Sequence, residues 1–522
     1  MSHIRLPAGH VSLLQALRRH LEHHGGEAWL VGGYIRDLLL EQPSGDMDLA
    51  VDGDALSLAR SFADMTGGSW VILDEKRNAA RIVWPPSIAG EWPHTVDLAR
   101  LRAPTIEDDL RGRDFTINAM AAPLDGASEF NSAQLIDPLG GIDDLRKGML
   151  RSCGPQALPD DWLRMLRAVR FAAQLNFRIS DELDAELRAG HALIAGVSVE
   201  RVRDELMKVL ALPNAGHWAA YLDQVGLLTT IIPELEPSRT CDQPSVHFLP
   251  VLAHLLEAVR AADWLLGKLG AQDAAAIDRP TGSPGLRSLP EAVRTYPNLL
   301  ARLPYAERIE ERLGETVDGV PRLALFKLAV LLHDVAKPQT KATKPDGGVS
   351  FYDHQMIGAE TAWAVARRLR LSRNACDYVR LIVREHMRPG QLNELGQALT
   401  TRAVYRFFRA TGATGPEVLL HSLCDHLAMK GPLLQPEGWD RHVDWTTHML
   451  ELFYAEDDAI RPGPLVRGDD LLRELRLKPG PLVGRLLEEV REAQAVGEVT
   501  TREQAIEWAR RLAGNLETGA EE

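Results

Sequence analysis

The sequence has few cysteines. Four occur among 522 residues, and no two of them have the C-x-x-C spacing of a zinc ribbon. They are Cys153, Cys241, Cys376 and Cys424. This scatter gives no sign of the disulfide framework of a small secreted protein, so a reducing compartment is expected.

A long apolar run is also missing. The most apolar stretch, residues 323–332, is interrupted by Lys327 and is too short to cross a bilayer core of about 30 Å. The first 24 residues lack the apolar core of about 7 to 15 residues that a secretory signal requires. We therefore expect a cytoplasmic protein with no membrane partner.

The chain has no excess of positive charge. Its 59 Lys and Arg residues face 73 Asp and Glu residues, which gives a formal net charge of −14. A protein that coats nucleic acid indiscriminately would be basic, so any nucleic acid partner must meet a local basic surface. The length is several times that of a typical domain of about 150 residues, and 45% hydrophobic residues are typical of globular proteins. Several folded domains are expected.

The pattern of the chain changes near residue 141. Between Trp29 and Ala122, short β-rich runs alternate with helical stretches, whereas helical periodicity dominates after Gly141. This indicates an α+β fold, with a mixed-sheet head followed by all-α domains. Residues 270–290 are rich in Gly, Pro, Ser and Ala, and predict a flexible insert. The expected domains are 1–140 (head), 141–238 (helical neck), 239–440 (helical domain with the insert) and 441–522 (helical C-terminal module).

Three acidic residues in the head are candidate metal ligands. A Gly32-Gly33 turn separates a predicted strand from a helix, and it would let backbone amides approach a triphosphate closely. Asp46 and Asp48 are two positions apart in the next strand, so their carboxylates share one face and suit a hard cation such as Mg²⁺. Asp97, on a further strand, is the best candidate for a third ligand of a two-metal site. A lone GG or D-x-D is more often structural, and it is their combination that favours a site.

A second polar motif follows in GRDFTINAMA, residues 112–121. Arg113 and Asn118 stand in an otherwise apolar segment, where a guanidinium and an amide are suited to phosphates and a sugar hydroxyl. GGYIRD with D-M-D and GRDFTINA together resemble the class II tRNA nucleotidyltransferase and bacterial poly(A) polymerase family, which has a head like that of DNA polymerase β. The resemblance covers at least residues 29–210, with Gly112 in place of the first Arg of the family's R-R-D-F-T-I-N-A. It implies that Arg36 and Asp114 also belong to the nucleotide site.

The resemblance also implies a nucleotide-selecting motif. The family's E-D-x-x-R corresponds here to residues 160–164, with Asp161 and Arg164 expected three positions apart on a helix. A carboxylate can accept a hydrogen bond from the exocyclic amine of cytosine or adenine, while a guanidinium donates to the ring acceptors. Uracil has an oxygen in place of that amine, so it would not bind. Arg167 and Arg170 extend this basic ridge toward phosphates. The alternative is an ordinary helix start, in which Asp160 caps the helix and Arg164 forms a surface ion pair.

The activity implied is template-independent addition of CMP, and of AMP as an open alternative, to tRNA 3′ ends from CTP and ATP. Only 16 positions separate Asp97 from Arg113. Family members that add CCA usually carry a longer loop there, and a deletion is associated with enzymes that add CC and stop. We therefore expect a CC-adding enzyme. The alternatives are a poly(A) polymerase, a phosphohydrolase with an RNA-binding head, and a non-catalytic RNA-binding protein.

A second cluster of candidate ligands lies in the helical part. Its order, H, HD, H, H, D, resembles that of the HD phosphohydrolase superfamily. Imidazole and carboxylate together suit Mn²⁺, Fe²⁺, Co²⁺ or Ni²⁺ better than structural zinc. The candidate ligands are His254, His333, Asp334, His354, His386 and Asp425. Two alternatives stay open, a phosphohydrolase centre and a helical body that only binds metal or helps to hold tRNA.

The last helical stretch resembles the C-terminal module of the same family, which favours tRNA as the partner. A turn is expected at Lys478–Pro481 between two helices, and Gly484 is expected to allow a close backbone approach. The sequence does not indicate an oligomeric state.

Overall fold

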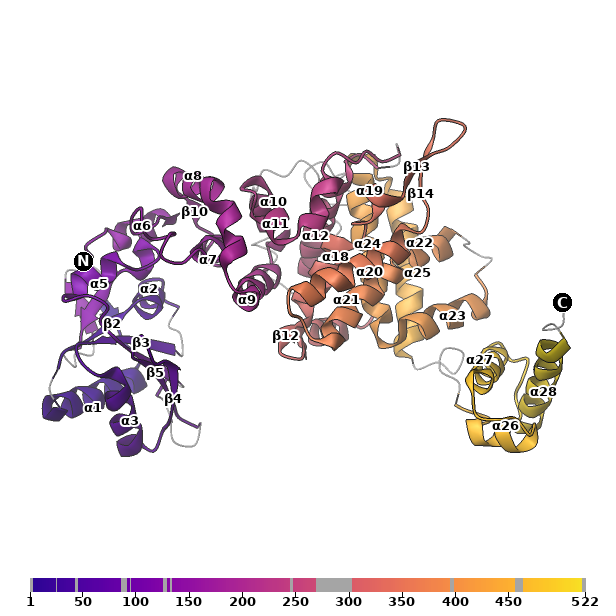
Figure 1. The fold of residues 1–522 in the computed structure, drawn as a ribbon, viewed down its shortest axis with the longest axis horizontal. Coiled ribbons are helices and arrows are strands. Elements are labelled where there is room, and N and C mark those ends of the chain that lie inside the picture. Colours follow the sequence, from indigo (N-terminus) through magenta and orange to yellow (C-terminus); the bar gives the residue numbers. More distant parts are fainter. Residues whose placement is uncertain are drawn as a thin grey trace. The chain divides into compact units, whose positions relative to one another are not determined.

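The computed structural model falls into two compact units, Met1–Ser198 and Val199–Glu522 (Figure 1). The expected insert at residues 270–290 lies outside the described residues. The described residues are 3–24, 26–42, 46–85, 92–93, 95–124, 129–131, 134–244, 247–268, 303–394, 399–455 and 463–518.

A six-stranded mixed sheet forms the centre of the first unit. Its strands are β2 (Ala28–Val31), β3 (Asp46–Val51), β4 (Ser69–Asp74), β5 (Ala79–Val83), β6 (Thr95–Arg100) and β7 (Ala121–Pro123). The order is β4-β5-β6-β3-β2-β7. Only the β3–β6 pair is parallel, and the other neighbours are antiparallel. The mixed α+β head expected from the sequence is confirmed.

The two faces of β3 have different partners, because side chains alternate along a strand. Met47, Leu49 and Val51 are buried on one face. On the other face Ala50 packs in a cluster with Ile106 of helix α5 (Ile106–Arg111), while Asp46 at the start of the strand is exposed. The acidic end of β3 therefore stays open next to a packed core.

Helices and short strands complete the first unit. Helix α3 (Ala55–Thr66) begins after Asp54, whose carboxylate accepts from the backbone N–H groups of Leu56 and Ser57, and it ends before Gly67, which is in the left-handed region. The other elements are β1 (His3–Arg5), α1 (Ala8–His24), α2 (Gly33–Leu39), α3 (Ala55–Thr66), η1 (Thr116–Asn118), β8 (Glu129–Asn131), α6 (Gly141–Lys147), β9 (Met149–Leu150), α7 (Arg164–Leu175), β10 (Arg178–Ile179), α8 (Asp181–Gly190) and η3 (His191–Gly196).

The described residues of the second unit are almost entirely helical, as expected, with two short hairpins. Helix α18 is at its centre, since every residue from Ala324 to Leu332 is buried. The elements before residue 456 are α9 (Val199–Leu210), α10 (Ala215–Gln224), α11 (Leu227–Ile231), η4 (Pro233–Ser238), α12 (Val251–Lys268), α17 (Ala306–Gly314), β11 (Thr316–Val317), β12 (Val320–Pro321), α18 (Arg322–Leu332), α19 (Lys337–Thr340), β13 (Lys341–Thr343), β14 (Val349–Phe351), α20 (His354–Arg368), α21 (Arg373–Glu385), α22 (Met387–Glu394), α23 (Thr401–Thr411), η6 (Gly412–Thr414), α24 (Gly415–Lys430), η7 (Gly431–Leu433) and α25 (Pro436–Tyr454).

Among residues 463–518, three helices form the C-terminal module, α26 (Gly468–Glu474), α27 (Pro481–Ala495) and α28 (Arg502–Thr518). They enclose a core of their own that includes Leu471, Leu486 and Ala509. The expected turn at Lys478–Pro481 separates α26 from α27. The expectation for Gly484 is wrong, because a Cβ built there would meet no atom within 4 Å.

No helix in the described part of the chain is long and apolar enough to span a bilayer.

Candidate active site and metal cluster

The three candidate acids of the head lie at one edge of the sheet. Asp46 and Asp48 are on β3, and Asp48 stands directly opposite Asp97 in the parallel pairing with β6. Register partners in a parallel pair point to the same face, so the three side chains share that face. The structure therefore brings Asp97 beside Asp48.

Each outer acid already has a partner from the sheet. Arg81 of β5 lies opposite Asp97 and donates two hydrogen bonds to its carboxylate, at 2.7 and 2.8 Å. The Thr95 hydroxyl donates to Asp46. Among the described residues, sets of three candidate ligand atoms within 4.8 Å of one another occur only in the second unit. A cation bound by all three acids would therefore compete with Arg81 for Asp97.

Asp48 is the acid with the most perturbed environment. Burial, together with the carboxylates of Asp97 and Asp46, raises the pKa of its carboxyl to about 6, although Arg113 and Arg36 oppose the shift. The two neighbouring carboxylates repel the negative charge of Asp48. A bound divalent cation would offset that repulsion. The carboxylate set thus fits a hard cation.

The Gly32-Gly33 turn brings the backbone close to this acid. Gly32 has a φ of +69°, and a Cβ there would lie 3.0 Å from the Arg113 guanidinium and 3.5 Å from Asp48 Oδ2. At Gly33 a Cβ would lie 3.7 Å from the same oxygen. The turn therefore needs glycine at position 32 for both its conformation and the space it leaves.

A buried polar network holds the other residues of the motifs. Arg36 Nη1 donates to Asn118 Oδ1 at 2.7 Å, and Asn118 Nδ2 donates to Asp114 Oδ1 at 3.1 Å. Asp114 Oδ2 accepts from Arg167 at 2.7 Å. Burial alone would raise the pKa of Asp114, but Arg167, with hydrogen bonds from Asn118 and the Phe115 N–H, holds the pKa below its usual range. The Asp114 carboxylate is thus placed to position its neighbours, with its oxygens already accepting hydrogen bonds.

Three arginines lie close to the ring of Phe171 in α7. The guanidinium carbons of Arg36, Arg167 and Arg170 lie 5.0, 5.3 and 4.0 Å from its ring centroid. Cations over an aromatic ring are attracted by its electron-rich face. The ring therefore joins α7 to the helix that follows the glycine turn.

Asp161 and Arg164 line one cavity of about 340 Å³. Helix α7 begins at Arg164, so Asp161 lies in the turn before the helix rather than one turn along it. Its Oδ1 accepts from the backbone N–H of Leu163 at 3.1 Å. The complete lining is Arg77, Arg102, Ala103, Asp108, Asp109, Gly112, Asp160, Asp161 and Arg164.

The structure does not bear out the ordinary helix start. The N-cap of α7 is Leu163, with no side-chain cap. Arg164 is half-buried and donates to the carbonyl oxygens of Ala157 at 2.7 Å and Arg113 at 3.3 Å. Burial lowers the pKa of its guanidinium. Arg164 is thus a fixed wall of the cavity.

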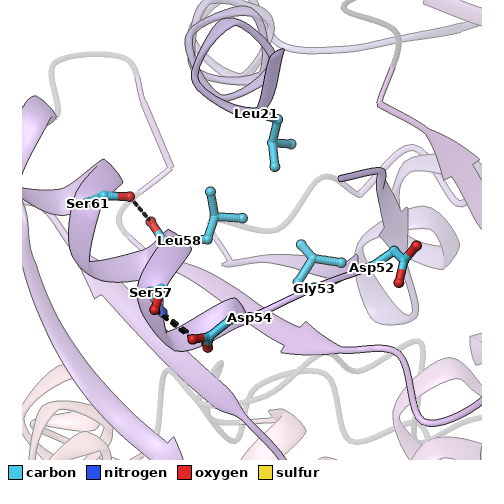
Figure 2. Close-up of a pocket in the computed structure, with 8 residues that line it drawn as sticks. Leu21, Asp52, Gly53, Asp54, Ser57, Leu58 and Ser61 are labelled. Atoms are coloured by element: carbon cyan, nitrogen blue, oxygen red, sulfur yellow. Dashed lines mark hydrogen bonds between the residues drawn. The ribbon is translucent and has the colours of Figure 1, made fainter. Parts of the chain in front are cut away.

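Another cavity, of about 300 Å³, lies at the opposite end of β3 (Figure 2). Leu21 of α1 and Leu58 of α3 face it, together with the loop Asp52–Asp54. The Asp54 carboxylate accepts from the Ser57 hydroxyl at 2.6 Å, and this bond is first among those that lower its pKa to about 2. Asp54 is therefore engaged in capping α3.

All six candidate ligands of the second cluster meet in the second unit. His254 comes from α12, His354 begins α20 and Asp425 lies on α24, while the other three follow α18 and α21. His254 Nε2 lies 3.2 Å from His333 Nε2 and 3.1 Å from Asp425 Oδ1. His254, 79 residues before His333 in the chain, belongs to the cluster by position.

Asp334 stands between two groups of these ligands. Its Oδ2 is 3.3 Å from His333 Nε2 and 3.6 Å from His254 Nε2, whereas its Oδ1 is 3.2 Å from His354 Nε2 and 3.6 Å from His386 Nε2. Burial opposes its charge, but Lys337 and His333 hold its pKa well below the usual range. The carboxylate can therefore contact ligands on both sides.

Backbone carbonyls orient three of the imidazoles. His333, His354 and His386 each have Nδ1 within 2.9 Å of the carbonyl oxygen three residues earlier. A carbonyl can only accept, so each Nδ1 carries a proton, and Nε2 is the atom with which the neutral imidazole would bind a metal. His254 Nδ1 is buried with no hydrogen-bond partner among the described residues. This donor set fits a divalent transition metal.

Several residues of both sites escaped the motif analysis. Lys337 is three positions after Asp334 and 2.6 Å from its carboxylate, so helical spacing could have indicated it. His421 precedes Asp425 by one helical turn, and its ring centroid lies 4.7 Å from that of His333. Arg81 and Arg102 had no motif to reveal them, because only strand register and cavity shape place them at the site.

Four family profiles match the chain in sequence. They describe a poly(A) polymerase head domain (residues 28–151), a probable RNA- and SrmB-binding site of polymerase A (176–238), an HD domain (300–430) and a second domain of tRNA nucleotidyltransferases (458–509).

Curated relatives resemble the chain over nearly its whole length. The A-adding tRNA nucleotidyltransferase of Deinococcus radiodurans is 32% identical over 494 residues, which cover 93% of this chain and 95% of the relative. The CC-adding tRNA nucleotidyltransferase of Geobacter sulfurreducens is 32% identical over 495 residues, covering 94% of each. Among solved structures, a Thermotoga maritima CCA-adding enzyme complexed with tRNA has a TM-score of 0.55, 23% identity, and coverage of 96% of this chain and 95% of that one. That likeness shows the fold.

Proposed function

Because this chain belongs to the tRNA nucleotidyltransferase family, it is a nucleotidyltransferase, and we propose that its reaction takes place at the edge of the sheet that carries Asp46, Asp48 and Asp97. The substrates are a tRNA 3′ end and CTP or ATP. The 3′-oxygen forms a bond to the α-phosphorus, the bond from that phosphorus to the bridging oxygen breaks, and pyrophosphate leaves. The observation that carries the proposal is the register of β3 and β6, which sets Asp48 opposite Asp97.

The three carboxylates would hold Mg²⁺ ions, which when bound lower the pKa of the attacking hydroxyl and neutralise the charge on the leaving pyrophosphate. The chain's own residues position the reactants. The Gly32-Gly33 turn lets backbone approach the phosphates, and Arg113 beside it adds a cation. Arg36, Arg167 and Arg170 add further positive charge around Phe171.

The cavity with Asp161 and Arg164 is proposed to receive the nucleobase. A carboxylate accepts from the exocyclic amine of cytosine or adenine, and a guanidinium donates to the adjacent ring acceptor. Arg164 is fixed by three backbone carbonyls, those of Ala157, Arg113 and Gly112, so its remaining donors are held in place. Uracil, which has an oxygen in place of the amine, would leave Asp161 without a donor.

Substitution of the acids tests the site. Asp46→Ala and Asp48→Ala are each expected to abolish incorporation of labelled CMP into tRNA. Asp52→Ala is the matched control, because Asp52 lies at the other end of the same strand. Incorporation by either variant at the rate of the unaltered enzyme would contradict the assignment.

The product is proposed to be CC rather than CCA. The segment between Asp97 and Arg113 consists of the end of β6, a short turn and α5, and all of it is described. It leaves no room for an additional loop. Sequencing of tRNA 3′ ends after incubation with CTP and ATP is expected to show CC, and a terminal A would refute this part of the proposal. Incorporation of ATP alone, in long runs, would instead favour a poly(A) polymerase.

A second activity, hydrolysis of phosphate esters, is proposed at the cluster of the second unit. The observation that favours it is the fixed Nε2 orientation of three histidines around Asp334. These ligands would hold Mn²⁺, Fe²⁺, Co²⁺ or Ni²⁺, which when bound polarises a phosphate ester and activates water. Lys337, 2.6 Å from Asp334, adds a cation at the same place.

The double variant His333→Ala/Asp334→Ala tests this activity with p-nitrophenyl phosphate and 2′,3′-cyclic nucleotides, each with added Mn²⁺ or Ni²⁺. Loss of hydrolysis with unchanged CMP incorporation is the expected result. The Asp46→Ala variant should show the reverse pattern. Equal hydrolysis by the double variant and the unaltered enzyme would leave the cluster without this function.

A further inference from the structure

The motif at residues 112–121 lacks the first arginine of the family's R-R-D-F-T-I-N-A motif. Gly112 stands at that position, and no side chain reaches the cavity from it. Arg102 lines the same cavity as Gly112. It lies in the turn between β6 and α5, outside the motifs named above.

One buried carboxylate holds Arg102 and the remaining motif arginine together. Asp109 is 3% exposed. Its Oδ1 accepts hydrogen bonds from Arg102 Nε at 3.1 Å and from the backbone N–H of Arg102 at 3.0 Å. Its Oδ2 accepts from Arg113 Nη2 at 3.1 Å. Burial would raise the pKa of Asp109, but Arg113 and Arg102 hold it below its usual value. Two cations are thus fixed side by side although the motif supplies only one.

We infer that Arg102 is a nucleotide-binding residue that replaces the missing motif arginine, and that its guanidinium contacts the nucleobase in the cavity. Only Nε is used on Asp109, so Nη1 and Nη2 can serve a ligand. The side chain is 44% exposed, as a residue on an open cavity wall should be. The inference rests on the proposal that this cavity receives the base.

The place of Arg102 favours the base over the phosphates. The cavity contains Asp161 and Arg164 but none of the residues of the glycine turn or the acidic strand. A guanidinium in this position can donate to the cytosine O2 oxygen or stack on the ring. Arg113, by contrast, lies next to Gly32 and the acids.

Steady-state kinetics with CTP and a tRNA ending before CC test the inference. Arg102→Ala is expected to raise the KM for CTP about 10- to 100-fold, the range for loss of a charge-assisted hydrogen bond. The inhibition constant of pyrophosphate, which occupies only the phosphate subsite, should stay unchanged. Arg100→Ala is the matched control, because Arg100 is exposed at the end of β6 and does not line the cavity.

A rescue variant separates binding from a purely structural role. Gly112 has a φ of −83°, and a Cβ there would meet only carbonyl oxygens at 3.5 and 3.9 Å, so a side chain fits. Gly112→Arg in the Arg102→Ala background should therefore restore most of the lost CTP affinity. Thermal unfolding of each variant shows whether the fold is kept.

Three results would overturn the inference. They are an unchanged KM in Arg102→Ala, a parallel change in the pyrophosphate constant, and no rescue by Gly112→Arg in a folded double variant. Asp161→Ala and Arg164→Ala serve as references for the cavity itself. If these two raise the KM for CTP and Arg102→Ala does not, only the role of Arg102 fails, whereas no effect from any of the three removes the base-binding cavity.

Discussion

At the scale of single residues, the glycine turn shows how little space the nucleotide site leaves. Gly32 combines a left-handed backbone with an arginine 3.0 Å from where a Cβ would stand. Asp48 Oδ2 is only 0.5 Å farther away, at 3.5 Å. Any side chain at position 32 would displace Asp48 or Arg113, which are proposed to bind the cation and the phosphates.

Gly32→Ala is therefore expected to reduce CMP incorporation at least about tenfold, because a Cβ at this φ adds strain of about 1 to 2 kcal/mol and its contact displaces Arg113 or Asp48. Gly484→Ala is the control. Gly484 lies inside α27 with no atom near its Cβ position, so alanine should stabilise that helix by up to about 1 kcal/mol. Incorporation rates and melting temperatures measure both effects, and a fully active Gly32→Ala would contradict the close approach.

Lys327 is a buried cation in the centre of the second unit. Its Nζ lies 2.7 Å from Asp263 Oδ1 and donates to the Leu212 carbonyl at 2.7 Å, while Asp263 Oδ2 accepts from the Gly216 N–H. The pair therefore ties α12 and α18 to the start of α10. Burial raises the pKa of Asp263 to about 6, against the pull of Lys327.

Lys327→Ala should lower the free energy of unfolding of this unit by about 3 to 5 kcal/mol, since it leaves a buried carboxylate without its partner. The double variant Lys327→Met/Asp263→Leu removes both charges and should recover much of that loss. Urea titration followed by circular dichroism measures the difference, with the exposed Lys344→Ala as control. A double variant no more stable than Lys327→Ala would show that packing, and not the charge, is the cause.

At the scale of elements, α23 and α27 meet through charges. Arg406 makes two hydrogen bonds to Glu492, at 2.7 and 2.8 Å, and Arg409 lies 2.7 Å from Glu488. Arg406 and Arg409 lie on one face of α23 because they are three positions apart. The core of the C-terminal module is separate from this contact. Ion pairs therefore join the two helices outside the core of the module.

We expect the pair Arg406→Ala/Arg409→Ala, or about 0.5 M salt, to loosen this contact without unfolding either helix, because partly exposed ion pairs contribute about 1 kcal/mol or less each and are screened. Fluorescence energy transfer between labels on α25 and α28 should fall. The control pair Arg373→Ala/Arg380→Ala removes one exposed and one half-buried charge from α21, whose ion-pair partners lie on α21 and α20. If energy transfer is the same in the two double variants, the contact does not depend on Arg406 and Arg409.

Patterns within an element could be predicted, and relations between elements could not. The two-residue period of a strand was enough to place Asp46 and Asp48 on one face, and β3 confirms it. The start of α7 was expected before Asp161 but begins at Arg164. The reason is that residues 160–163 form turns closed by backbone hydrogen bonds, such as the one from the Arg164 N–H to the Asp161 carbonyl. The spacing of apolar residues along the sequence does not indicate such turns.

At the scale of the whole molecule, the cavity and the acids belong to the first unit, while the histidine cluster belongs to the second. The C-terminal module adds a third core with no residue in either site. A chain that ends at residue 455 should therefore keep its KM for CTP.

The same truncation is expected to raise the KM for tRNA about tenfold, because we expect the module to contact tRNA, and a tenfold change corresponds to about 1.4 kcal/mol of binding free energy. Steady-state assays with CTP and tRNA varied in turn measure the two constants. Circular dichroism checks that the shortened chain is folded. An unchanged KM for tRNA would remove the module from substrate binding.

The sequence by itself determined the local features of this protein, namely the alternation that makes the head α+β, the D-x-D face and the order of the six histidine and aspartate ligands. Only the tertiary structure decided that Asp97 stands opposite Asp48 and is bound by Arg81, that His254 joins His333 from 79 residues away, and that Arg102 lines the cavity beside Gly112. The physical reason is that periodicity and capping act over a few residues. Strand pairing and helix packing instead join segments whose separation along the chain carries no information about their distance in space.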